Sequence, residues 1–390
     1  MASLTYIFQN IDLSVGYIII LLFYISFALL SKLYKNKKFL LLCLLIIILI
    51  AGTRSIVNDD LKNYRIMYEN YTSLNLSQIE PGFIFLSYIL NQITSNVHLL
   101  FFVYSVLEIF FIYFTIKNFT SHIEFSFFLY LIIPFLFLAS LIGIRQGLAM
   151  VISFYALSLL YNNHKLKYFI FSAIAICFHY TAILFFFISI FTFLIFKKRI
   201  NFLLALILIA VTLLIHFTGI DFLILKFILS NIGQFVPLKY QHYINPLLTN
   251  TLPLKGFSTL SILFLNILLL TVLFVINYPY IFKYKKHNFT DNFTKYNLVI
   301  NLLIIGTLIN NLFGSFADIT ARIYYYFIFI YTILIPEMFC KIKKEDRILI
   351  AYVFLLVMVV WFFSGVYNQF SNSNIPPLIY KNYFISGDLY

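Results

Sequence analysis

The chain has 390 residues, of which 62% are apolar and only 11% are charged, and its formal net charge is +13. A soluble globular protein is roughly 45–50% apolar and about 25% charged, so this composition excludes a water-soluble domain. At about 20 residues per span, the length predicts about 11 to 12 transmembrane helices in one all-α, polytopic membrane domain that covers residues 1–390.

Apolar runs follow one another along the chain. They cover residues 15–31, 39–52, 97–116, 125–143, 147–161, 168–196, 200–219, 259–280, 297–313, 323–340 and 348–364. The run 168–196 has 29 residues, too many for one untilted span and too few for two full spans. We therefore expect two short helices that enter and return, with a break near His179 that faces a cavity, because a broken helix in lipid must be buried or line water.

The position of the cations indicates the topology, and no nucleic-acid partner is expected. Short clusters lie between the apolar runs: Lys32, Lys35, Lys37 and Lys38; Lys197, Lys198 and Arg199; Lys283, Lys285 and Lys286; Lys341, Lys343, Lys344 and Arg347. Because loops rich in Lys and Arg stay in the cytoplasm, the clusters predict that residues 52–96, 220–258 and 365–390 lie outside. In the first of these external segments, residues 82–93 are expected to form an interfacial helix.

Neither a cofactor nor a metal is expected. Cys43, Cys177 and Cys340 are isolated and lack the spacing of a metal or disulfide site. Asp59 and Asp60 are adjacent in sequence, and alone they offer too few ligands for a metal ion.

Ionisable side chains at membrane depth are costly and mark candidate functional sites. With the N-terminus outside, such groups gather at the outer face: Arg54, Arg145 with the neighbouring Gln146, His179 and Arg322. Guanidinium groups bind phosphate oxygens bidentately and keep their charge, so an arginine cluster there suits a diphosphate. The alternative is that each arginine reaches the headgroups by itself and binds nothing further.

Three other ionisable residues have two interpretations each. His179 is a candidate to accept the proton of an attacking hydroxyl, or it simply bonds a backbone carbonyl at a helix end. Glu108 and Glu337 are lone acids within apolar runs. Each either serves an ion-coupled carrier or makes an interhelical hydrogen bond.

Tyrosines in the first external segment suggest a helical face. Tyr64, Tyr68 and Tyr71 are four and three residues apart, a spacing that places them on one side of a helix. Such a face could stack on sugar rings or could pack against the protein.

A set of short motifs occurs in a fixed order over residues 52–326. They are Gly52-Thr53-Arg54, Asp59-Asp60, Tyr64, Glu80-Pro81-Gly82, Ile144-Arg145-Gln146, Ala175-Ile176-Cys177-Phe178-His179-Tyr180-Thr181-Ala182 and Arg322-Ile323-Tyr324-Tyr325-Tyr326. In order and interval, this set resembles the EpsG/Wzy group of bacterial polysaccharide polymerases. That group is generally likened to the metal-independent membrane glycosyltransferases of the GT-C-like class.

The resemblance implies a multi-pass glycosyltransferase of the bacterial inner (cytoplasmic) membrane that acts at the periplasmic face. It would join undecaprenyl diphosphate-linked repeat units, as donor and acceptor, into an O-antigen, capsule or exopolysaccharide, and a chain-length regulator protein is a further partner to consider. Arg145 and Arg322 would hold the diphosphate, and His179 would deprotonate the acceptor hydroxyl. Substrate contacts would come from Arg54, Asp60, Tyr64, Glu80, Gln146, Tyr180 and Tyr325, with Asp60 and Glu80 orienting sugar or arginine side chains.

Three alternatives stay open. An O-antigen ligase, which moves finished glycan onto lipid A core, would use the same arginine and histidine chemistry. A flippase for lipid-linked oligosaccharide predicts cations along a central cavity instead of at the outer edge, and we see none of the internal repeats that many transporters carry. A membrane O-acyltransferase would use an outward-facing His but gives the arginine motifs no role.

Overall fold

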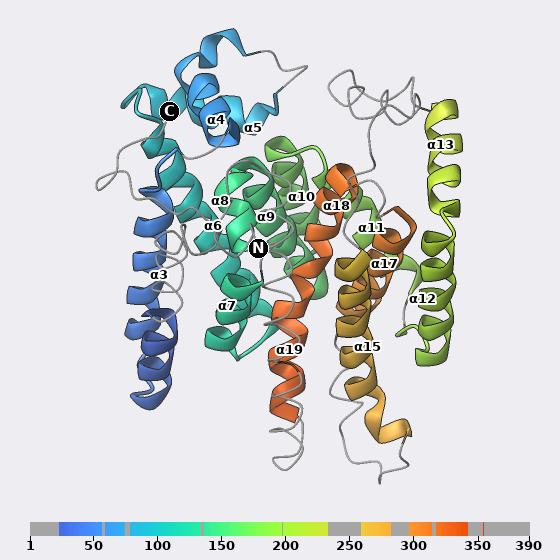
Figure 1. Cartoon of the computed structure of the whole chain (residues 1–390). Coiled ribbons are helices and arrows are strands. Elements are labelled where there is room, and N and C mark those ends of the chain that lie inside the picture. Colours follow the sequence, from blue (N-terminus) through green and yellow to red (C-terminus); the bar gives the residue numbers. More distant parts are fainter. Residues whose placement is uncertain are drawn as a thin grey trace, which may run out of the picture. The chain divides into compact units, whose positions relative to one another are not determined.

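The computed structural model describes residues 23–56, 59–74, 79–133, 136–196, 198–232, 259–281, 296–313, 317–341 and 354 (Figure 1). Every element in these ranges is a helix, which confirms the all-α expectation. The chain folds into two compact units, residues 1–183 with 362–390 and residues 184–361.

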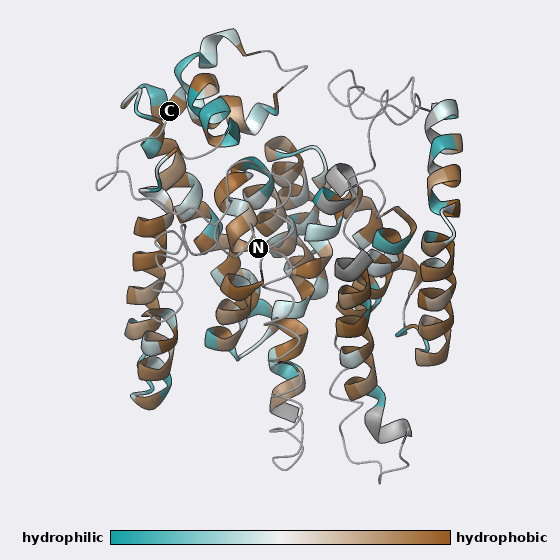
Figure 2. Ribbon diagram, viewed as in Figure 1, coloured by the Kyte–Doolittle hydropathy of each residue, from teal (hydrophilic) through white to brown (hydrophobic). Residues whose placement is uncertain are grey.

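Apolar helices dominate both units (Figure 2). Two of the described helices are long and apolar enough to cross a membrane: α6 (Val97–Phe119) and α9 (Ile144–Tyr161). Eight further apolar helices have 10 to 17 residues. This pattern fits a membrane protein, as the composition requires.

The first unit is built around α6 and α9. Its other elements are the helix Phe23–Leu33, α3 (Lys38–Gly52), α4 (Asp59–Glu69), the 3-10 helix η1 (Tyr71–Ser73), α5 (Pro81–Asn91), α7 (Ile123–Ile132), α8 (Phe137–Ile142) and α10 (Lys165–Phe178). Helix α5 corresponds to the interfacial helix expected at residues 82–93.

Aromatic pairs set the directions of α6, α9 and α10. Phe111 and Phe119 of α6 contact Tyr155 and Tyr161 of α9, with ring centroids 5.4 and 5.0 Å apart, so these two helices run parallel. Helix α10 returns antiparallel and packs Phe171 on Tyr155, with centroids 4.8 Å apart.

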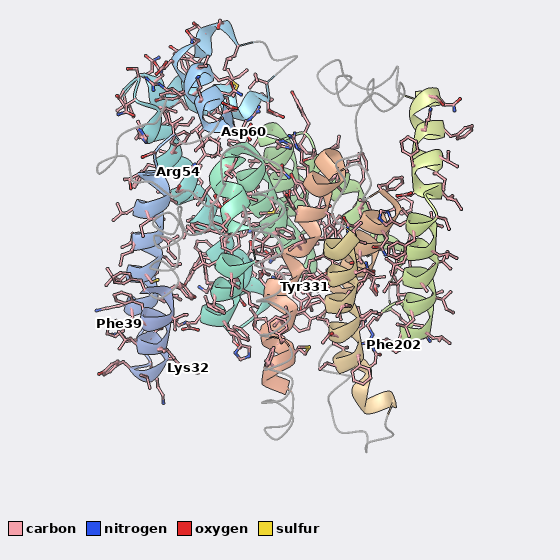
Figure 3. The ribbon with its side chains drawn as sticks, in the orientation of Figure 1. Lys32, Phe39, Arg54, Asp60, Phe202 and Tyr331 are labelled. Atoms are coloured by element: carbon pink, nitrogen blue, oxygen red, sulfur yellow. The ribbon has the colours of Figure 1, made fainter. Side chains whose placement is uncertain are left out.

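The two ends of the first unit carry different chemistry. Helix α3 runs antiparallel to α6, because a Cβ on Gly52, the last residue of α3, would lie 2.6 Å from the Phe102 ring near the start of α6. Figure 3 shows Arg54 at one end of α3, near Asp60, and Lys32 at the other. The lysine end also holds the end of α6 and the start of α10, with Lys117, Lys165 and Lys167.

The apolar run 125–143 is not one helix, contrary to the expected continuous span. Helix α7 ends at Ile132 and α8 begins at Phe137. Pro134 stands between them in the sequence, and proline disfavours helix at the preceding residue and cannot donate its own backbone bond.

The helix break expected near residue 179 is present. Helix α10 ends at Phe178, His179 has an extended backbone (φ −157°, ψ 122°), and α11 (Ala182–Ile195) follows. That the two helices enter and leave on the same side stays a prediction.

The second unit contains most of α11, followed by α12 (Phe202–Phe217), α13 (Ile220–Ile232), α15 (Thr259–Ile281), α17 (Asn297–Phe313), α18 (Ala317–Ile328) and α19 (Ile330–Lys341). The run expected as one span at 323–340 is therefore divided at Phe329. Helix α13 occupies the start of the expected external segment 220–258. The described residues do not include the rest of that segment (233–258), the expected tail 365–390, or the apolar run 348–364 apart from Phe354.

Buried amides hold the second unit together. Asn266 of α15 and Asn311 of α17 exchange hydrogen bonds of 2.8 and 3.0 Å, and Asn311 also donates to Thr212 of α12 at 3.1 Å. Asn301 accepts from the Ile200 backbone N–H at 2.8 Å and so fixes the segment before α12 to α17. Such bonds tie helices together in lipid, where apolar burial gives little drive.

We expect Gly147→Ala to destabilise the first unit by about 1 to 3 kcal/mol, because the added Cβ would lie 2.5 Å from Ser140 Cβ and 2.9 Å from Ser140 Cα. The matched control is Gly143→Ala, whose Cβ would meet no atom closer than 3.5 Å. Unfolding in mixed micelles, followed by circular dichroism, measures the difference. Equal stability of the two variants would contradict the close packing of α8 on α9.

Candidate active site

An ion pair joins the residue before α5 to the start of α9. Arg145 lies in the first turn of α9, and its Nη1 donates to Glu80 Oε2. Glu80 has an extended backbone and is followed by Pro81 at the first position of α5, which suits a helix start. The side chain of Glu80 is 3% exposed and that of Arg145 is 19% exposed, so a buried acid holds the guanidinium while part of the arginine side chain stays exposed.

Aromatic rings surround this guanidinium. Arg145 Cζ lies 5.4 Å from the ring centroid of Tyr64 and 5.5 Å from that of Phe83. The two rings are themselves 5.9 Å apart. Cation–π attraction therefore adds to the ion pair in fixing the position of the charge.

Tyr104 of α6 belongs to the same cluster. Its ring is 2% exposed and meets the ring of Phe178 edge-on, with centroids 6.0 Å apart. Its hydroxyl lies within electrostatic reach of Arg145, Tyr64 and Glu80. Sequence reasoning missed this residue because one tyrosine among thirty carries no signal by itself.

His179 lies at the end of α10, next to the start of α5. The two segments approach so closely that a Cβ on Gly82 would lie 2.7 Å from the carbonyl oxygen of Cys177. His179 Nδ1 lies 2.6 Å from Thr181 Oγ1, and the ring is buried. The Thr181 backbone N–H also donates to Nδ1, at 3.4 Å, so Thr181 is a positioning residue that the sequence did not reveal.

Arg54 is buried inside the first unit, with 5% exposure. Its Cζ lies 4.6 Å from the ring centroid of Phe101, and its Nη1 donates to the carbonyl of Ala51. Glu108, seven residues after Phe101 and so on the same face of α6, lies within electrostatic reach of Arg54. An independent reach of Arg54 to the headgroups does not fit this burial.

Glu108 makes the interhelical hydrogen bonds that were one of its two interpretations. The hydroxyls of Tyr130 (α7) and Ser140 (α8) both donate to its Oε1. The acid thus connects the two sides of the break between α7 and α8.

Tyr64, Tyr68 and Tyr71 were expected on one helical face, and two of them are packed inside the protein. Tyr64 and Tyr68 are buried in α4, and Tyr71 lies in η1. The Tyr68 hydroxyl donates to the Thr94 carbonyl at 2.7 Å, and burial raises the pKa of this phenol to about 12, so it stays a donor at physiological pH. Tyr68 therefore serves packing.

The remaining candidates lie at several places. Asp60 is exposed on α4, Gln146 is partly exposed on α9, and Tyr180 lies within electrostatic reach of Glu80. Arg322 and Tyr325 lie on α18 in the second unit, partly exposed. That Arg322 joins Arg54 and Arg145 at one site stays a prediction.

The comparison with known families agrees with the motifs. A model of the EpsG family matches residues 37–380, nearly the whole chain. The chain belongs to the EpsG family. This confirms the resemblance and indicates a polysaccharide polymerase-like role for a membrane protein. Neither the curated proteins nor the solved structures contain a significant match to this EpsG-family chain.

We expect the Glu80–Arg145 pair to show a coupling free energy above about 1.5 kcal/mol in a double-mutant cycle, because both groups lie in a low-dielectric environment. The variants are Glu80→Ala, Arg145→Ala and the double variant, compared by unfolding in mixed micelles. The control cycle uses Arg65 and Glu69, a pair one helical turn apart with side chains 40% and 43% exposed, which should couple by less than about 0.5 kcal/mol. Equal coupling in both cycles would show that the buried pair is not an anchor.

Proposed function

We propose that this EpsG-family protein joins undecaprenyl diphosphate-linked oligosaccharide repeat units by glycosyl transfer at the periplasmic or exterior face of a bacterial cytoplasmic membrane. The observation that carries the proposal is Arg145, a guanidinium at the start of a spanning helix that Glu80 and two aromatic rings hold in place while 19% of the side chain stays exposed. Family membership supports the same class of reaction.

The reaction is a displacement at the anomeric carbon of the donor, the growing glycan on its lipid diphosphate. A hydroxyl oxygen of the acceptor, a single lipid-linked repeat unit, attacks this carbon, and the bond from the carbon to the diphosphate oxygen breaks. The electron pair leaves with the diphosphate, and the hydroxyl proton passes to the imidazole of His179. Attack opposite the leaving group inverts the anomeric centre.

The arginines act on the leaving group. Cleavage of the sugar–phosphate bond gives the diphosphate one more negative charge than it had in the ester. Positive groups fixed in advance at that position therefore stabilise the transition state more than the substrate. Arg145 is the main contact in this proposal, Arg322 the second, and the buried Arg54 contributes its field.

The distribution of lysines and arginines between the two ends of the first unit supports an outward-facing site. Lys32, Lys117 and Lys165 lie at one end of the unit, and Arg54 and Arg145 at the other. Lysine-rich ends stay in the cytoplasm, so the arginine end would face outward. The arginines of this unit gather at one end of α6 and α9 instead of along their length, which favours a polymerase over a flippase.

The test is polymerisation by purified protein in liposomes, using lipid-linked repeat units extracted from cells that lack the protein. The wild-type protein should give a ladder of products on a gel. His179→Ala should remove the ladder, and Arg145→Lys, which keeps the charge but loses the planar fork, should slow it by about tenfold or more.

His164→Ala is the control for His179→Ala, because His164 is exposed at the opposite end of α10. It should polymerise like the wild type. If His179→Ala and Arg145→Lys are folded and polymerise normally, the assigned roles are wrong. Transfer that occurs only when lipid A core is added would identify a ligase.

The orientation can be tested by labelling single cysteines in a background without Cys43, Cys177 and Cys340. A membrane-impermeant maleimide added to intact cells that expose the outer leaflet should label Asp60→Cys, on the exposed face of α4, and should not label Lys37→Cys. In permeabilised cells, the maleimide should label both Asp60→Cys and Lys37→Cys. The reverse pattern in intact cells would invert the topology and place Arg145 on the cytoplasmic side.

A further inference from the structure

Two of the buried polar groups in the first unit that make no hydrogen bond within the described residues belong to one cluster. The Tyr104 hydroxyl and Arg145 Nε are both inaccessible to solvent and make no hydrogen bond within the described residues. A buried donor without a hydrogen bond costs more free energy than a typical hydrogen bond contributes to stability. Most buried donors are therefore paired. Two orphan donors in one cluster can both serve an acceptor that none of the described residues supplies.

One donor belongs to the guanidinium of Arg145, and the other lies near it. Tyr104 comes from α6 and lies within electrostatic reach of Arg145. Glu80 accepts from Nη1 of Arg145, which leaves the Nε–H for another ligand. A guanidinium can hold two anions in this way, one along each edge of its planar fork.

The chemistry of the missing acceptor follows from its partners. An N–H of a cation and a phenol O–H together suit an anionic oxygen better than a sugar hydroxyl, which must donate as well as accept. The carboxylate of Glu80 balances the charge of Arg145 within the protein. Arg54, which lies on Phe101 about one helical turn from Tyr104 along the same face of α6, supplies further positive field for an incoming anion.

We propose that Tyr104 is a substrate-binding residue whose hydroxyl, together with Arg145 Nε, donates to one phosphate oxygen of the lipid diphosphate. This inference rests on the proposed function and adds to it a contact that no sequence motif indicated. The phenol contributes a donor without a charge, so it binds the anion without repelling the nearby arginines. No bond is made or broken at Tyr104.

The test compares two tyrosines that differ in one respect. Tyr104→Phe removes a hydroxyl that has no hydrogen-bond partner among the described residues, whereas Tyr68→Phe removes one that donates to the Thr94 carbonyl at 2.7 Å. Each full-length variant is placed in nanodiscs, and its Kd for undecaprenyl diphosphate and its thermal midpoint without ligand are measured. Undecaprenyl monophosphate serves as the second probe.

Tyr104→Phe should weaken undecaprenyl diphosphate binding by roughly ten- to a hundredfold, the effect of losing a hydrogen bond to a charged group, and should leave the thermal midpoint unchanged or higher. Tyr68→Phe should lower the midpoint and leave the Kd unchanged. If Tyr104 had only a structural role, Tyr104→Phe would change the thermal midpoint and leave the Kd for the lipid diphosphate unchanged.

Each other outcome is decisive. If the wild type binds the lipid diphosphate and Tyr104→Phe binds it equally well, the inference is wrong and the proposed function survives; an ordered water then satisfies the phenol. If the monophosphate binds as tightly as the diphosphate and loses as much in Tyr104→Phe, the contact is to any lipid phosphate and the diphosphate assignment is overturned. If the wild type binds neither lipid, the proposed function fails and the inference with it.

Discussion

The ion pair between Glu80 and Arg145 links two segments 65 residues apart, and the geometry of the candidate site depends on it. A lone guanidinium at the edge of the hydrocarbon would turn toward water or headgroups. Glu80 prevents this because it is itself buried and fixed at the start of α5. The segment between α3 and α6 is thereby attached to the start of α9, and the charge stays at one position. In a low dielectric such an anchored charge acts more strongly than a mobile surface arginine.

Interrupted helices bring the polar groups of the first unit together. The break between α7 and α8 surrounds Glu108, which receives hydroxyl donors from both sides. Ser140 of α8 also packs on Gly147, half a turn beyond Arg145, so the position of Glu108 affects the start of α9. The break after α10 leaves His179 with an extended backbone beside α5. Both interruptions lie inside the protein, where their free backbone groups can find partners.

Much of this arrangement could be predicted from the sequence. Arg54, Arg145 and His179 stood out because ionisable groups are rare in apolar runs, and the long run 168–196 indicated its own break. The pairing of Glu80 with Arg145 was only one of two roles expected for that acid, since a sequence shows which charges exist and not which of them meet. Tyr104 gave no signal at all: it is one ring in a chain that is 20% aromatic, and only its position beside Phe178 and Arg145 distinguishes it. The break at Pro134 was missed because hydropathy alone does not register proline.

The short helices have a consequence for the surrounding bilayer. Helices α3, α12 and α17 have 15, 16 and 17 residues, which corresponds to about 22 to 26 Å of helix, whereas the hydrocarbon of a typical bilayer is about 30 Å thick. Lipids next to such helices must compress, at a cost of a fraction of a kcal/mol per Å of mismatch. The bilayer around such helices would therefore be thinner than the bulk membrane.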